Sequence, residues 1–312
     1  MPPSAPFATL PVSALPLRPR IPHRFLELPV LDVLVESSAF GRHRIAYRRL
    51  GEGPPLLLVH GLMTSGYSFR YVIEPLARHF TVYVPDLVGQ GMSEKPDRPY
   101  RARALASSIA DFQRAVGIRG CDVIGNSLGG YLSMLLALDD PGAIARLVNL
   151  HSPAVPMPRF YALRTAMSLP FAERVLATAV RQDLRTWIQR NVHYYDESLK
   201  SIEELDVYGA PLATPDGLHA FARILRETMD PSDFGDFEDR LESRRARREA
   251  FPIPLVLLYA ERDPMVPPSV GTRLHALVPD AELVWLPRAS HFAHVDAVER
   301  FLPPTLAFLG VE

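Results

Sequence analysis

The sequence predicts an α/β fold in which a mostly parallel sheet is flanked by helices and a separate block of helices is inserted. Short apolar runs alternate with helical segments up to residue 150, and the alternation resumes after residue 250. Strands that alternate with helices imply parallel pairing through right-handed crossovers. We therefore expect a core at 31–153 and 251–312, a helical cap at 154–250 and an N-terminal arm at 1–30.

The arm is rich in proline, which removes backbone donors and disfavours both helices and central strands. We expect an extended, partly disordered segment without a function of its own. Its prolines are Pro2, Pro3, Pro6, Pro11, Pro16, Pro19, Pro22 and Pro29.

Eight strands are predicted after the arm. The first two should form a hairpin, because the short segment between them contains Gly41. The run Leu56–Val59 is too short for a helix and is typical of a strand buried on both faces. The predicted strands are 31–36, 43–50, 56–59, 81–84, 121–125, 144–150, 253–259 and 281–286.

Helices are predicted between these strands and throughout the cap. Pro215 and Asp216 favour the start of one cap helix, since proline and an acidic residue suit a first turn. In the core, the predicted helices are 67–79, 101–116, 131–138, 269–278 and about 295–309. The main cap helices are 171–191 and 215–229.

Composition excludes several classes of partner. The 312 residues include 34 basic and 35 acidic side chains, so a formal charge of −1 offers no field for nucleic acid. No apolar run approaches the roughly 20 residues that span a bilayer, and the N-terminus lacks the apolar stretch of a secretory signal. The single cysteine, Cys121, lies in an apolar segment and should be buried and reduced. We expect a cytoplasmic protein without stable membrane insertion, as a monomer or a homodimer.

The stretch Gly125-Asn126-Ser127-Leu128-Gly129 places a serine between a strand and a helix. This is the geometry of a nucleophile elbow, a strained turn where side chains on the glycines would collide with the neighbouring strand and helix. Taken alone, the motif also fits a glycine-rich turn with an incidental serine. The other strand ends decide between these interpretations.

Two further polar residues follow predicted strands: Asp263 and His291. Ligands bind beyond the carboxyl ends of parallel strands, so these side chains should meet Ser127. Glu261 competes with Asp263 for the acid position, but it should point the other way from the strand end. His294 competes with His291, but it should already lie in the last helix.

At this point the chain resembles the α/β-hydrolase family over nearly all of residues 31–310 apart from the cap. The resemblance is strongest in the branch that contains esterases, carbon-carbon bond hydrolases, epoxide hydrolases and haloalkane dehalogenases. The last two use an aspartate nucleophile, so Ser127 disfavours both. The matching segments are His60-Gly61, 86–93, the elbow at 125–129, 263–267 and 290–296.

The resemblance implies a Ser127-His291-Asp263 triad. His291 would take the serine proton and return it to the leaving group, and Asp263 would orient the imidazole. The backbone N–H of Leu128 follows the nucleophile and would stabilise the oxyanion; the resemblance adds that of Leu62.

Other residues near these motifs have less reactive interpretations. His60 is expected to order the oxyanion loop rather than contact substrate, and Asp86 to brace the loop after its strand. A metal site at His291, His294 and Asp296 lacks further clustered ligands, and no nucleotide motif occurs, so no cofactor is expected.

The cap is expected to roof the pocket and to select the substrate. Its aromatic, Met and His side chains could line the pocket, although such residues are more often core. They are Met157, Phe160, Trp187, His193, Tyr194 and Tyr195.

The sequence therefore predicts a serine hydrolase that cleaves a carboxylic ester of a small or medium apolar substrate through an acyl-enzyme. Carbon-carbon bond hydrolysis of a vinylogous diketone is the first alternative, because it would use the same serine and histidine. A ligand-binding homologue with little turnover is the second.

Overall fold

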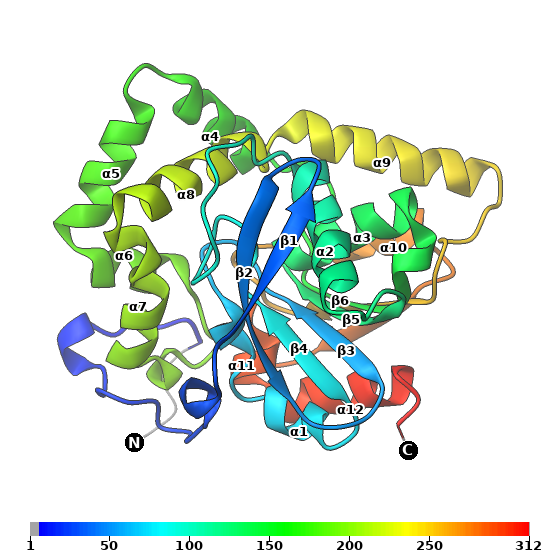
Figure 1. The fold of residues 1–312 in the computed structure, drawn as a ribbon, viewed down its shortest axis with the longest axis horizontal. Helices are drawn as coiled ribbons and strands as arrows, with labels where there is room; N and C mark the ends of the chain where they lie inside the picture. Colours follow the sequence, from blue (N-terminus) through cyan, green and yellow to red (C-terminus); the bar gives the residue numbers. More distant parts are fainter. Residues whose placement is uncertain (1–5, 312) are drawn as a thin grey trace.

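An eight-stranded sheet runs through the protein, and we describe it from a computed structural model whose described residues are 6–311 (Figure 1). Its order is β1-β2-β4-β3-β5-β6-β7-β8, with antiparallel pairs β1/β2 and β2/β4 and parallel pairs elsewhere. The predicted hairpin and the mostly parallel sheet are confirmed. The strands are β1 (Leu31–Ser37), β2 (Gly41–Leu50), β3 (Pro55–Val59), β4 (Thr81–Pro85), β5 (Cys121–Asn126), β6 (Ile144–Leu150), β7 (Leu255–Ala260) and β8 (Glu282–Leu286).

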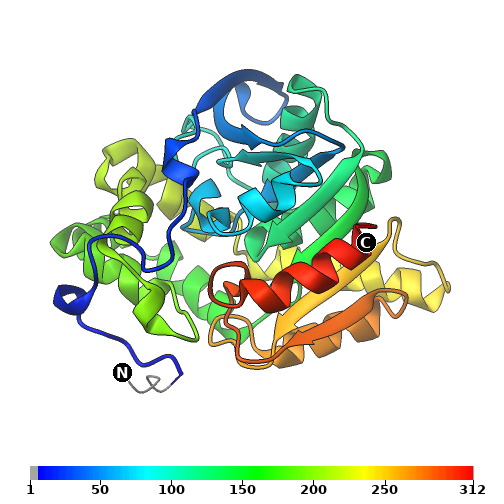
Figure 2. The same cartoon turned by 90° about the horizontal axis from the view of Figure 1, so that it is seen from below.

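Helices cover both faces of the sheet, and each face has its own apolar cluster (Figure 2). Alternate residues of β3 supply the two clusters: Leu57 and Val59 face one, whereas Leu56 and Leu58 face the other. The core helices are α1 (Ile73–Ala77), α2 (Ala102–Ala115), α3 (Leu128–Asp139), α10 (Pro268–Leu277), α11 (Ala293–Asp296) and α12 (Val298–Phe308).

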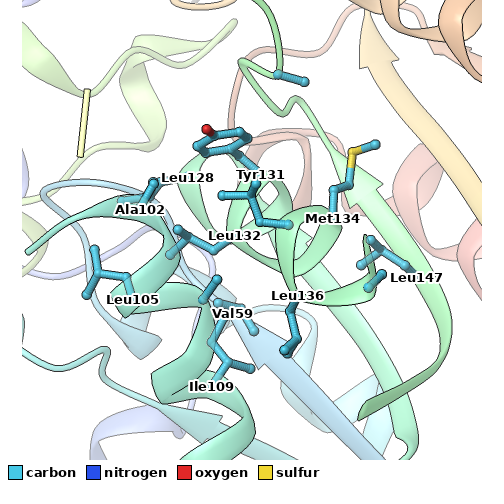
Figure 3. Packing of buried hydrophobic residues seen from close by; sticks show 14 of the residues in the cluster. Val59, Ala102, Leu105, Ile109, Leu128, Tyr131, Leu132, Met134, Leu136 and Leu147 are labelled. Atoms are coloured by element: carbon cyan, nitrogen blue, oxygen red, sulfur yellow. The ribbon is translucent and has the colours of Figure 1, made fainter. Parts of the chain in front are cut away.

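The helix after the elbow is held in the first of these clusters. Figure 3 shows Leu132 and Leu136 of α3 beside Val59 of β3 and beside Leu105 and Ile109 of α2. All five side chains are at most 3% exposed. Because α3 begins at Leu128, this packing fixes the position of the residue before it, Ser127.

Residues 154–250, called the cap segment below, contain helices and turns but none of the eight strands. Figure 1 shows α4 to α8 gathered at one side of the sheet, while α9 runs back toward α10. These helices are α4 (Pro158–Ser168), α5 (Ala172–Gln182), α6 (Leu184–Asn191), α7 (Ile202–Gly209), α8 (Pro215–Glu227) and α9 (Pro231–Ala246).

Three predicted helices were wrong in their extent. The segment 67–79 forms the 3-10 helix η3 (Gly66–Phe69) and then α1, because Pro75 lacks a backbone donor and suits only a first turn. The segment 171–191 is divided at Asp183, whose side chain accepts a hydrogen bond from the Thr186 N–H at 3.0 Å and starts α6. The last predicted helix is likewise divided, into α11 and α12.

Within the described residues, the N-terminal arm is extended apart from two short 3-10 turns, and Figure 2 shows it running beside the cap segment. Backbone carbonyls of Pro16 and Leu17 accept hydrogen bonds from the N–H groups of Ile202 and Glu203 at 2.9 and 3.0 Å. The predicted extended conformation is confirmed for the described part of the arm. The two hydrogen bonds also attach the arm to the start of α7. Pro2 and Pro3 lie outside the described residues.

Candidate active site

The sharp turn at Ser127 connects β5 to α3, and its backbone has φ 54° and ψ −119°. A non-glycine residue in this region is strained and persists only where its surroundings hold it. The flanking glycines explain how the turn closes. A Cβ on Gly129 would collide with the carbonyl oxygens of Val59 and His60, and one on Gly125 would collide with the backbone of Gly129 and Gly130. The structure thus has the strand, turn and helix that an exposed nucleophile requires.

Asp263 and His291 come together beyond the ends of β7 and β8. His291 Nδ1 lies 2.7 Å from Asp263 Oδ2. The other carboxylate oxygen, Oδ1, accepts hydrogen bonds from the N–H groups of Met265 and Val266 at 2.6 and 2.9 Å. Burial opposes ionisation of Asp263, but the charge interaction and hydrogen bond with His291, helped by the hydrogen bond from the Val266 N–H, hold the pKa of its carboxyl below the ordinary value. An ionised Asp263 keeps a proton on Nδ1 and leaves Nε2 as the basic nitrogen.

His291 and Ser127 open into the same cavity, which has a volume of about 380 Å³. His291 Nε2 is buried and has no hydrogen-bond partner among residues 6–311. An imidazole that is oriented on one side and unpartnered on the other is suited to move a proton within the cavity.

The two rival residues lie elsewhere. Glu261 is exposed and does not line the cavity. His294 is fully buried against Phe69, with ring centroids 4.9 Å apart, and burial lowers the pKa of its imidazole well below the ordinary value. Neither residue therefore has the geometry of Asp263 or His291.

Two backbone N–H groups are candidates for the oxyanion site, those of Leu62 and Leu128, and both residues line the cavity. Leu128 is the first residue of α3, so its N–H has no partner within the helix. The loop of Leu62 is held by His60, which accepts a hydrogen bond at Nε2 from the Leu87 N–H and donates from Nδ1 to the Gly61 carbonyl, at 2.9 and 2.8 Å. His60 does not line the cavity, in agreement with its predicted loop-ordering role.

Asp86 braces the neighbouring loop as predicted. Its carboxylate accepts hydrogen bonds from the N–H groups of Gly66 and Met92, each at 2.7 Å. These bonds connect the segment after β4 to η3 at the side of the site.

The cap segment supplies much of the cavity wall. Of the six cap residues considered from sequence, Phe160 and Trp187 line it, whereas Met157, His193, Tyr194 and Tyr195 do not. Tyr194 instead donates a hydrogen bond from its hydroxyl to buried Glu204. The other cap residues in the wall are Arg159, Leu163, Met167, Leu176, Asn191, Phe221, Leu225 and Met229.

Sequence reasoning missed two polar residues that support the site. The side-chain amide of Asn126 donates to the carbonyl of His291 at 3.1 Å, so it ties the elbow to the histidine loop. His151, which directly follows β6 and has φ 53°, accepts a hydrogen bond at Nε2 from the Ala260 N–H at 2.6 Å. The polar residue directly before Ser127 in the elbow was a signal for Asn126, but nothing in local spacing indicated His151.

His151 packs beside His291 without carrying charge. Its ring centroid is 5.6 Å from that of His291, and burial lowers the pKa of its imidazole to about 3. A neutral ring at this position fills the space behind His291 and adds no cation that would compete for Asp263.

Within residues 6–311, no group of three or more His, Cys, Asp or Glu side chains is arranged to hold a metal ion. No helix in the same residues is long and apolar enough to cross a membrane. Cys121 is buried, as predicted, and burial raises the pKa of its thiol to about 11.

Comparisons with family models, curated sequences and solved structures all point to one family. The alpha/beta hydrolase fold family model matches residues 54–298. An uncharacterized protein of Mycobacterium tuberculosis is 28% identical over 89% of this chain and 84% of its own length. The 2-hydroxy-6-oxo-2,4-heptadienoate hydrolase of Pseudomonas putida is 26% identical over 84% of this chain and 91% of its own length.

A solved structure shares the fold. A thermophilic esterase from Thermogutta terrifontis superposes with a TM-score of 0.71 at 23% identity, covering 90% of this chain and 98% of that one. The family match spans the elbow and the two loops that carry Asp263 and His291. The chain therefore belongs to the alpha/beta hydrolase family.

Proposed function

We propose that this protein is a serine hydrolase that cleaves a carboxylic ester with an apolar portion. The observation that carries the proposal is one shared cavity. It contains the strained Ser127, the unpartnered Nε2 of an Asp263-bound His291, and two candidate backbone donors. Its walls are mainly aliphatic, aromatic and thioether side chains, which suit an apolar substrate.

The proposed reaction begins when Ser127 Oγ attacks the ester carbonyl carbon and His291 Nε2 takes the hydroxyl proton. The N–H groups of Leu62 and Leu128 stabilise the negative oxygen. When the ester C–O bond breaks, His291 gives its proton to the departing alkoxide and an acyl-enzyme remains. Water then attacks the acyl carbon, His291 takes a water proton and returns it to Ser127, and the carboxylic acid leaves.

A fluorophosphonate probe followed by peptide mapping tests the nucleophile. We expect label on Ser127 in the folded wild type and none in Ser127→Ala. Ser133 is a useful internal control, because it is a buried serine of α3, the helix that follows Ser127, and its hydroxyl donates to the Gly129 carbonyl. Label elsewhere, or no label on Ser127 in folded protein, would contradict the assignment.

Hydrolysis of a carbon-carbon bond is the second candidate function. It is favoured by the similarity to the 2-hydroxy-6-oxo-2,4-heptadienoate hydrolase of Pseudomonas putida. A panel of p-nitrophenyl esters of increasing acyl length, compared with a vinylogous diketone, distinguishes the two reactions. Tight binding of panel compounds with negligible turnover would instead favour a ligand-binding homologue.

A further inference from the structure

Arg159 is a charged side chain in an otherwise apolar cavity wall. Among the described residues that line the cavity, no other residue is a lysine, arginine, aspartate or glutamate. It lies in the first turn of α4, at the point where the chain leaves the core and enters the cap segment. Part of its side chain is exposed to solvent, which places it at the rim of the cavity.

The Arg159 guanidinium has no ion-pair or hydrogen-bond partner within residues 6–311. Its recorded contact is with the ring of the adjacent Phe160, 5.3 Å from the guanidinium carbon to the ring centroid. Several other cap arginines pair with carboxylates on neighbouring elements. Arg164 pairs with Asp230 at 2.8 Å, and Arg185 pairs with Asp206 at 2.7 Å.

No carboxylate in the site is available to neutralise Arg159. Burial lowers the pKa of its guanidinium, and Asp263 is the acidic residue that opposes this shift. Both oxygens of Asp263 are already used, one by His291 and the other by backbone donors. Arginine remains charged in proteins, so its planar donors are left for a ligand.

We propose that Arg159 binds a carboxylate on the substrate, and that the substrate class is the half-ester of a dicarboxylic acid with an apolar spacer. This assignment rests on the proposed ester hydrolysis at Ser127. A carboxylate matches the guanidinium through two parallel N–H···O bonds, and its single negative charge matches the single cation of the wall. Phe160 and Leu163 line the same part of α4 and provide apolar surface for the spacer.

A matched pair of substrates isolates the charge. Monomethyl adipate carries a free carboxylate, whereas dimethyl adipate has the same spacer and scissile ester without it. We expect Arg159→Gln to lower kcat/KM for the half-ester by roughly 10- to 100-fold, mainly by raising KM. The kcat/KM for the diester should change by less than about twofold. Arg159→Lys should retain part of the preference, because it keeps the charge but loses the planar fork.

Arg174→Gln is the matched control. Arg174 is an exposed cap arginine that stacks on Phe171, with its guanidinium carbon 5.3 Å from the ring centroid, and it does not line the cavity. Its loss removes the same charge from the cap and should leave the half-ester preference unchanged. An equal loss on both substrates in Arg159→Gln, or the same selective loss in Arg174→Gln, would overturn the proposal.

A binding measurement separates this proposal from the proposed reaction. Calorimetry with adipate on Ser127→Ala should give binding that the added Arg159→Gln weakens by roughly 10- to 100-fold. Equal adipate affinity of the two variants would overturn the carboxylate site even if ester hydrolysis stands. Conversely, an Arg159-dependent affinity would support the site even if no ester turnover depends on Ser127. Thermal melts of both variants check that each is folded.

Discussion

The two halves of the candidate site are built in different ways. On the sheet side, every residue of β5 and β7 is buried, and the candidate reacting groups follow directly from strand ends. On the cap side, α4 and α5 each bury a single residue, Phe160 and Val180. Apolar packing therefore fixes the strands that carry the candidate reacting groups, whereas much of the opposite wall belongs to helices that bury few of their residues.

Polar contacts fasten the cap segment to the core. The ion pair between Arg70, just after η3, and Glu204 of α7 has an N–O distance of 2.9 Å and is almost fully buried. Glu197 and Lys200 form a second buried pair at 2.5 Å within the cap. A buried ion pair is stable only while its two charges stay in contact, because a buried charge without a partner costs much free energy. The sheet side is therefore suited to hold the proposed chemistry, and the cap side to select the substrate.

The sharpest test of the sheet side concerns the two neighbouring histidines. His291→Ala should lower kcat by about 10⁴-fold or more, because the serine would lose its base. His294→Ala should retain most of the turnover, because His294 does not line the cavity. Initial rates on the best ester substrate measure both. If His294→Ala lost turnover and His291→Ala kept it, the assignment of His291 as the base would be contradicted.

The fastening of the cap is tested by removing one member of its buried pair. Glu204→Ala should lower the free energy of unfolding by roughly 3–5 kcal/mol, because the Arg70 charge would remain buried and unpaired. Denaturant titration measures the change. Asp206→Ala is the matched control on the same helix: its exposed pair with Arg185 should contribute only about 0–1 kcal/mol. Similar losses of unfolding free energy in both variants would show that the buried ion pair contributes no more than the exposed one.

A smaller effect is expected at Asp296, which links the histidine loop to the cap. Its carboxylate accepts hydrogen bonds from the N–H groups of Tyr195 and Ser290 at 2.7 and 3.3 Å. Burial raises the pKa of this carboxyl to about 6 from a usual 3.8. Since the folded state binds the proton more tightly, this contribution is fully present below pH 4 and is lost as the pH rises to about 6.

Asp296→Asn removes this titration. Relative to wild type, the free energy of unfolding of the variant should rise by roughly 2 kcal/mol between pH 4 and pH 7. Urea titrations at each pH measure the difference, and Glu52→Gln on an exposed turn serves as the control. A pH-independent difference between Asp296→Asn and wild type would show that the carboxyl does not link stability to pH in this way.

Most of the sheet could be predicted because buried strands are short apolar runs between turn residues. β6 agrees with its predicted range, and β5 differs by one residue. Helix extent was less predictable where local chemistry interrupts a helical pattern, as at Pro75 and Asp183. The sequence did carry a signal at each position: Pro75 lacks a backbone donor, and Asp183 can cap a helix. The apolar periodicity nevertheless continued across both residues, so it predicted a single helix in each segment.

The sequence by itself determined which residue types follow which strands: a serine between two glycines, an aspartate before a proline-rich turn, and a histidine near the C-terminus. It could do so because turns and strand ends are local, and strained backbone restricts residue choice there. Tertiary structure alone decided that Asn126 reaches the His291 carbonyl, that His151 packs beside that ring, and that Arg159 remains without a carboxylate in the cavity wall. Those relations join residues far apart in the chain, and their distances depend on how the sheet and cap segment pack together.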